Sequence, residues 1–183
     1  MRSSWRSLGM VVTCAAVSLA GGHAAAQSNA AVLGRMAAAD QGEIMQAQYA
    51  AQNATRDDVR EYANMLVSDH TGHLQAVRDT ASALAVTPDS TAARDLMAAA
   101  QRQMAQLQGL SGPALDRQFL VFMVQDHGGL QRELDGLIRQ GQPAQLLPFI
   151  RATRAVVHRH LVDAQNLQRG GQHSMSVHKD NGR

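Results

Sequence analysis

Two copies of an Asp-His pair are the residues in this sequence best suited to chemistry. The segment Val67-Ser68-Asp69-His70-Thr71-Gly72 returns in similar form as Val124-Gln125-Asp126-His127-Gly128-Gly129. An imidazole next to a carboxylate can bind a metal ion, transfer a proton or form a buried hydrogen-bond network. The repetition predicts that two helices present the same pair to a shared interior.

Other metal-ligand types lie on further segments of the chain. His160 occupies an apolar stripe where leucine would be the ordinary choice, and Asp40 and Glu43 lie three residues apart beside another stripe. Imidazole combined with carboxylate suits iron, manganese or zinc. The residues predicted to bind such an ion are Glu43, Asp69, His70, Asp126, His127 and His160.

A structural explanation competes with this metal site. Di-iron ferritins place Glu-x-x-His on two helices and a single Glu on each of the others, and this chain contains no Glu-x-x-His. Each Asp could instead orient a His across a helical interior, forming a buried polar network. The missing motif favours the network and leaves the metal site as the alternative.

The sequence predicts no catalytic residue and no organic cofactor. Ser68 and Ser111 lack a nucleophile elbow, and no triad can be recognised around them. An enzymatic activity is therefore not the expectation.

The elements that must position these residues are helices. Aromatic residues make up only 3% of the chain, while Ala, Gln, Arg, Leu and Met, which favour helices, are abundant. Apolar residues spaced three and four apart predict helices over residues 30–52, 56–84, 91–108, 113–140 and 145–168. Thr55 and Asp58 have the spacing of a capping box at the start of the second helix.

These helices predict an all-α, ferritin-like four-helix bundle. Two hairpins with short loops are joined by a long crossover that contains the short helix 91–108. His70 and His127 each lie 14 residues past Arg56 and Pro113, the predicted helix starts, which is roughly 21 Å along each helix. If the crossover spans the bundle, both Asp-His pairs lie at one height, near the levels of His160, Asp40 and Glu43.

Residues 1–26 have the pattern of an export signal. Arg2 and Arg6 precede an apolar stretch, and Ala24-Ala25-Ala26 supplies small residues for cleavage before Gln27. The apolar stretch is too short to span a bilayer. A lipoprotein with its N-terminus at Cys14 is the alternative. We expect a periplasmic or secreted protein with a domain over residues 27–168 and a disordered polar tail over 169–183.

Removing the predicted signal changes the charge and the thiol content. Loss of Arg2 and Arg6 reduces the formal charge from +2 to zero, because 15 basic residues then face 15 acidic ones. A neutral chain with dispersed charges has no electrostatic reason to bind nucleic acid. Cys14 is the single cysteine, so disulfides and thiolate ligands are excluded from the predicted mature domain.

A family resemblance rests on a set of motifs spread over residues 30–168. The matching positions are Gly42, Glu43, Val59, Tyr62, Ala63, Met65, Val67, Asp69, His70, Leu110-Ser111-Gly112, Asp116, Phe119, Met123, Val124, Asp126, His127, His160, Leu161, Ala164 and Leu167. In these positions the chain resembles the bacterial exported ferritin-like proteins grouped as "domain of unknown function 4142". The resemblance implies a ferritin-like fold and an envelope or outer-membrane association, but no activity.

Two functions follow as expectations. The first is a non-enzymatic helical module of the cell envelope or of a stress response, with a buried Asp/His network and unknown partners. The alternative is a divalent metal-binding, ferritin-like protein.

Overall fold

The computed structural model describes residues 28–141 and 143–170 of the chain. Within them the chain forms α1 (Asn29–Asn53), α2 (Asp57–Ala83), α3 (Arg94–Gln108), α4 (Gly112–Gln140) and α5 (Leu147–Gln168), a 3-10 turn η1 (Ala144–Leu146), and no strand. The predicted all-helical bundle is confirmed. The predicted export signal (1–26) and nearly all of the predicted tail (169–183) lie outside the described residues.

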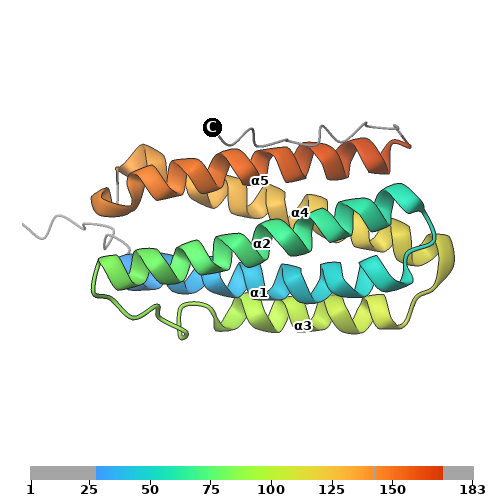
Figure 1. Cartoon of the computed structure of the whole chain (residues 1–183), viewed down its shortest axis with the longest axis horizontal. Helices are drawn as coiled ribbons and strands as arrows, with labels where there is room; N and C mark the ends of the chain where they lie inside the picture. Colours follow the sequence, from blue (N-terminus) through green and yellow to red (C-terminus); the bar gives the residue numbers. More distant parts are fainter. Residues whose placement is uncertain (1–27, 142, 171–183) are drawn as a thin grey trace, which may run out of the picture.

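Two antiparallel helix pairs, α1 with α2 and α4 with α5, form the bundle, and α3 lies against α1 (Figure 1). At one end, Asp116 near the start of α4 bonds to Thr55 and Arg56 at the start of α2. At the other end, the backbone N–H of Asp89, in the loop after α2, donates to the carbonyl of Ala30 in α1 over 2.8 Å. The long connection therefore spans the bundle, and α2 and α4 run parallel as predicted.

The start of α2 is capped from another helix rather than by the predicted capping box. Asp116 accepts hydrogen bonds from the Thr55 backbone N–H (2.8 Å), the Thr55 hydroxyl (2.5 Å) and the Arg56 backbone N–H (3.0 Å). Asp58 pairs instead with the Arg56 guanidinium. The capping-box prediction is wrong because the buried Asp116 carboxylate of α4 accepts from the Thr55 backbone N–H, which Asp58 was expected to accept, and from the Thr55 hydroxyl, which therefore acts as a donor.

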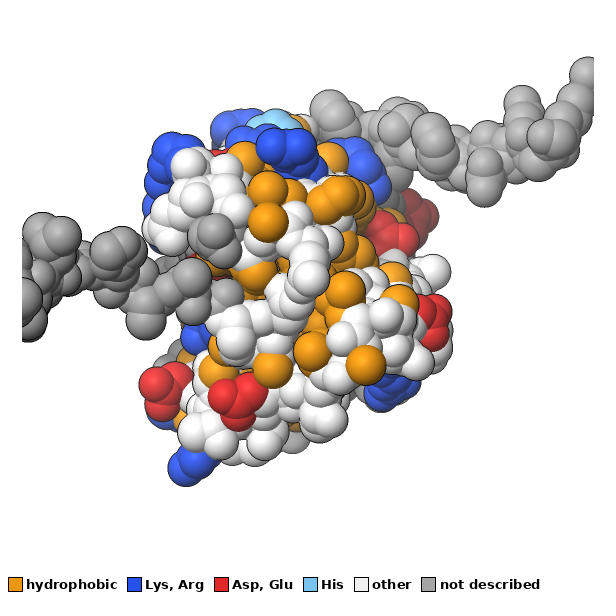
Figure 2. Space-filling model, turned by 90° about the vertical axis from the view of Figure 1, so that its left-hand side faces the viewer, with side chains coloured by type: hydrophobic (Ala, Val, Ile, Leu, Met, Phe, Trp, Pro, Cys, Tyr) orange, Lys and Arg blue, Asp and Glu red, His pale blue; other side chains and the backbone are white. Residues whose placement is uncertain are grey.

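The hydrophobic core has two parts. One lies toward the start of α2 and includes Tyr62, Leu66, Phe119 and Met123, with Tyr62 and Phe119 in contact. The other lies toward the start of α1 and includes Leu33, Leu134, Leu146 and Ile150. Figure 2 shows the molecule from this second end, where hydrophobic side chains reach the surface between polar ones.

Burial of apolar side chains holds the helices together. None of the described helices combines the length and the hydrophobicity needed to cross a bilayer. The two apolar clusters are separated by buried polar residues in the middle of the bundle. Folding must therefore bury these polar groups together, since each needs a partner once water is excluded.

Two glycines of α1 permit close contacts with the crossover. A Cβ atom on Gly34 would overlap the backbone oxygen of Asp89, and a Cβ on Gly42 would lie 2.7 Å from the Cβ of Ala100 in α3. Real Cβ atoms do not approach neighbours this closely. The absence of side chains at these positions lets the loop and α3 rest directly on α1.

Candidate metal centre

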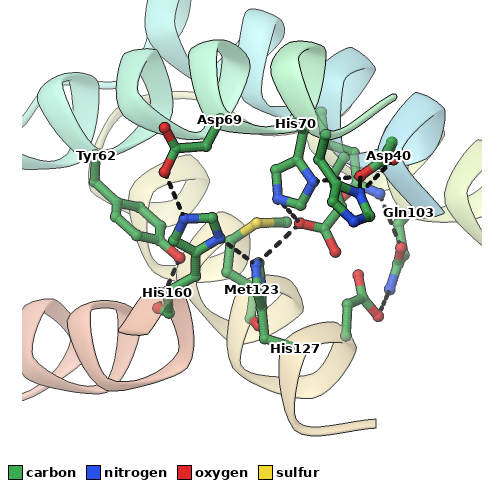
Figure 3. A network of polar contacts seen from close by, with 12 residues as sticks. Asp40, Tyr62, Asp69, His70, Gln103, Met123, His127 and His160 are labelled. Atoms are coloured by element: carbon green, nitrogen blue, oxygen red, sulfur yellow. Dashed lines mark hydrogen bonds and ion pairs between the residues drawn. The ribbon is translucent and has the colours of Figure 1, made fainter. Parts of the chain in front are cut away.

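Each of the four bundle helices contributes one side chain to a buried polar group, which we call the central cluster. It consists of Glu43 from α1, His70 from α2, His127 from α4 and His160 from α5. Their exposed fractions are 4%, 5%, 0% and 1% respectively. Figure 3 shows the three histidines pointing toward one another. The equal depth of His70 and His127 in their parallel helices brings them to the same height.

The ring nitrogens and one carboxylate oxygen lie close together at the centre. Glu43 Oε2 is 2.8 Å from His70 Nε2 and 3.1 Å from His127 Nε2. His127 Nε2 is 3.3 Å from His160 Nδ1. One ligand nitrogen from each histidine lies within 4.8 Å of the others. Four potential ligand atoms from four helices thus converge on a single point.

The outward-facing nitrogen of each ring is held by a hydrogen-bond acceptor. His70 Nδ1 lies 2.9 Å from Asp40 Oδ1, His127 Nδ1 lies 2.9 Å from the Met123 carbonyl, and His160 Nε2 lies 3.0 Å from Asp69 Oδ2. Carbonyls and carboxylates only accept, so these nitrogens carry the proton and donate. The neutral form of each ring then turns the lone pair of its other nitrogen toward the centre.

With all three rings neutral, the centre therefore contains several hydrogen-bond acceptors and no hydrogen-bond donor. Among the described residues, Glu43 Oε2 and His70 Nε2 have no hydrogen-bond partner of acceptable geometry, although the two atoms are only 2.8 Å apart. Facing lone pairs repel in a buried site unless a positive charge lies between them. The arrangement requires either a proton or a metal cation at this point.

Without a metal, that proton is on His70. Burial opposes the charge on His70, but Glu43 together with the hydrogen bond to Asp40 raises the pKa of His70 to about 10. Burial also opposes ionisation of Glu43, yet the imidazoles of His127 and His70 lower the pKa of Glu43 to about 2. Glu43 and His70 therefore form a buried ion pair in the metal-free protein.

The other two histidines of the cluster differ from His70. Burial lowers the pKa of His127 to about 4, against the attraction of Glu43, so this ring is neutral at neutral pH and its Nε2 is free to bind a cation. His160 forms a hydrogen bond with the Asp69 carboxylate, and this bond lowers the pKa of Asp69.

A second layer of polar residues continues from the cluster toward the surface. Asp40 accepts from both His70 and His73, and His73 Nε2 lies 2.8 Å from the Thr153 hydroxyl. The His73 ring stacks on Phe149 at an interplanar angle of 10°. A cavity of about 20 Å³ lies beside these residues, which is close to the space one water molecule needs.

The structure separates the six residues that the sequence singled out. Glu43, His70, His127 and His160 converge, and Asp69 lies one layer out as the partner of His160. Asp126 lies apart from them, accepts a hydrogen bond from Gln103 over 3.0 Å and has its pKa raised by burial to about 6. Asp126 was predicted to converge with the other five residues, but its carboxylate pairs with Gln103 outside the central cluster.

Sequence reasoning missed the roles of two buried residues. Asp40, which is 2% exposed, orients His70 and His73. The sequence feature that could have indicated this role was the position of Asp40 three residues before Glu43. Thr153 extends the network from an apolar stripe of α5. A threonine at such a position resembles an ordinary core residue, so no sequence signal distinguished it.

Comparison with known proteins gives one match. A family model described as "Domain of unknown function (DUF4142)" matches residues 15–167. No curated protein and no solved structure matches the chain. The matched range includes every residue of the central cluster.

Proposed function

We propose that this chain, which belongs to the DUF4142 family, binds one divalent transition-metal ion in the central cluster. The observation that carries the proposal is the orientation of the three histidines. Each ring donates its outer N–H to a fixed acceptor and turns its other nitrogen toward the centre, where those of His70 and His127 lie beside Glu43 Oε2 and that of His160 lies beside His127 Nε2. Metal-binding histidines are held in this way in metalloproteins, where the outer partner fixes the ring and its tautomer.

The spacing of the four atoms supports the proposal. A tetrahedral ion with ligands at roughly 2.0 to 2.1 Å separates neighbouring ligand atoms by about 3.3 Å. Three of the six separations among these atoms are 2.8, 3.1 and 3.3 Å, and the three histidine nitrogens all lie within 4.8 Å of one another. The three shortest separations are therefore within about 0.5 Å of the value for a tetrahedral ion.

The ligand types restrict the metal. Three imidazoles and one carboxylate favour zinc or iron(II), with manganese less favoured because it prefers oxygen ligands. Calcium and magnesium prefer oxygen ligands throughout. Displacement of the His70 proton by the ion would make binding weaker as the pH falls.

The helix order supports a ferritin-like arrangement for this protein. Two antiparallel helix pairs joined by one spanning crossover are characteristic of that bundle, although the cluster lacks the paired Glu-x-x-His ligands of the di-iron members. We also propose that the protein works in the periplasm or outside the cell, on the strength of its predicted export signal. The proposed role of the domain is metal binding, and we assign it no enzymatic activity.

Calorimetric titration of zinc into the chelator-stripped full chain tests the proposal. We expect one ion per chain for the unaltered protein. His160→Gln should remove this binding because it takes away one of the inward-facing nitrogens. His158→Gln is the matched control, since His158 lies on the same helix but is exposed.

Two results would contradict the proposal. One is an unaltered protein that binds no zinc, iron(II) or manganese. The other is binding that His160→Gln leaves intact, which would place the ion elsewhere on the chain. Either result would leave the cluster as a structural network in which the proton on His70 takes the place of the cation.

A further inference from the structure

A cavity of about 300 Å³ lies between α1, α3 and α4, on the far side of Glu43 from the histidines. Its walls are mostly small or apolar, and include Val32, Met36, Ala39, Ala99, Leu130 and Leu134. This volume is at the lower end of the range for small-molecule sites, roughly 300 to 1,000 Å³. The cavity is therefore large enough for a small organic molecule.

The cavity arises from how α3 packs. Gly42 brings α3 onto α1, because its missing Cβ leaves room for Ala100. Away from this contact the facing residues Ala39, Ala99 and Gly129 are too short to fill the space between the three helices. The cavity is therefore a consequence of residue sizes along all three helices.

Two glutamines of the cavity wall, Gln46 and Gln103, donate hydrogen bonds to other groups of the wall. Gln46 Nε2 donates to Gln103 Oε1 over 3.0 Å, and Gln103 Nε2 donates to Asp126 Oδ1 over 3.0 Å. Gln46 is 1% exposed, and its Oε1 has no hydrogen-bond partner among the described residues. A buried acceptor of this kind needs a donor from whatever occupies the cavity.

Among the described residues, Arg35 is the only cationic residue of the cavity wall, and its guanidinium is also occupied. The Arg35 guanidinium forms two hydrogen bonds of 2.7 Å with Glu133, and a third of 3.2 Å with the Ala92 carbonyl. The remaining charged residues of the wall, Glu43 and Asp126, are acidic. A carboxylate or phosphate ligand would therefore find no free cation and would meet two acidic groups.

We infer that this cavity binds a small neutral molecule with an apolar body and a hydroxyl group that donates to Gln46 Oε1. The apolar walls would bury the body of the molecule, and the hydroxyl would satisfy the acceptor that the protein leaves open. This inference goes beyond the proposed metal binding and does not depend on it, because Gln46 and the apolar walls are present without any ion.

Two isomeric probes, hexan-1-ol and methyl pentyl ether, test the inference. They have the same atoms and similar apolar surface, but only the alcohol can donate a hydrogen bond. Both are titrated into the full chain with a chelator present, and binding is followed by chemical-shift changes in protein NMR spectra. We expect the alcohol to bind about tenfold more tightly, the value of one hydrogen bond to a buried acceptor.

Three variants separate the cavity from other surfaces. Gln46→Met removes the acceptor and should abolish the preference for the alcohol while the ether still binds. Ala99→Leu fills the cavity and should weaken both probes at least tenfold. Ala105→Leu is the matched control, because Ala105 lies on the same helix but is exposed and does not line the cavity.

Equal affinity of the two isomers for the unaltered chain would overturn the inference, and so would alcohol binding that Ala99→Leu leaves unchanged. The use of a chelator keeps these outcomes separate from the metal proposal. A chain that fails to bind zinc can still distinguish the isomers, and a chain that binds zinc can fail to do so.

Discussion

Replacement of Glu43 by Gln should change both the stability of the metal-free protein and its dependence on pH. Gln has nearly the same shape as Glu but no charge, so the variant keeps the packing and removes the ion pair with His70. Breaking a buried ion pair by removing one partner costs about 3 to 5 kcal/mol. We expect a loss of that size in the free energy of unfolding at about pH 6.5, where His70 is protonated in the folded chain.

The pH dependence gives a sharper expectation than the size of the loss. The pKa of His70 rises from 6.5 to about 10 on folding, which corresponds to about 5 kcal/mol. A raised histidine pKa stabilises the protein fully below pH 6.5, and this stabilisation is lost as the pH rises toward 10. Between these limits the folded chain holds one more proton than the unfolded chain, so stability falls by about 1.4 kcal/mol per pH unit.

Urea unfolding of both proteins with a chelator present measures this difference. Titrations of groups that do not interact with Glu43 occur in both chains and cancel when the two are compared. The stability gap between the unaltered protein and Glu43→Gln should shrink toward zero as the pH rises from about 6.5 to about 10. A gap that stays constant over this range would refute the assignment of the proton to His70.

Three further predictions concern other parts of the molecule. Asp116→Ala should lower the free energy of unfolding by about 2 to 3 kcal/mol in urea, because the donors at the start of α2 lose their shared acceptor; an unchanged midpoint would contradict this. Gly34→Ala should destabilise by about 1 to 3 kcal/mol through overlap with the crossover backbone, whereas Gly72→Ala, in an open helical position, should stabilise by roughly 0.5 to 1 kcal/mol. Intact-mass measurement of exported protein should find an N-terminus at Gln27, and a diacylglyceryl addition at Cys14 would instead show a lipoprotein.

Helix positions and depths could be predicted from the sequence because they depend on local spacing. The apolar repeat located α2 and α4, and the uniform helical rise placed His70 and His127 at one height once the crossover was taken to span the bundle. The meeting of these two histidines needed no knowledge of side-chain contacts. Helix periodicity and a crossover that spans the bundle were sufficient.

The partners of each side chain could not be predicted in the same way. Asp69 and Asp126 both precede a histidine, yet Asp69 bonds to His160 while Asp126 bonds to Gln103. Which carboxylate enters the centre depends on the tilt and rotation of each helix, and these are set by packing across the whole interface. The sequence therefore could not show that Glu43, rather than Asp126, meets the histidines.

The same limit applies to the start of α2 and to the cavity. Thr55 matched a local capping motif, but the carboxylate of Asp116 reached it from a helix distant in sequence. The apolar spacing that predicted the crossover helix over residues 91–108 contained no sign of the space left between α3 and α1. Both features arise from contacts between segments far apart in the chain.

Elemental analysis of the full chain, purified without a histidine tag, measures directly whether the central cluster holds a metal ion. We expect one zinc or iron ion per chain, and the same amount in a control that carries His173→Ala and His178→Ala, two histidines outside the described residues. His127→Ala should contain none, because it removes a nitrogen whose outer partner is already fixed. A metal content near zero in the unaltered chain after growth and reconstitution with these ions would contradict the account.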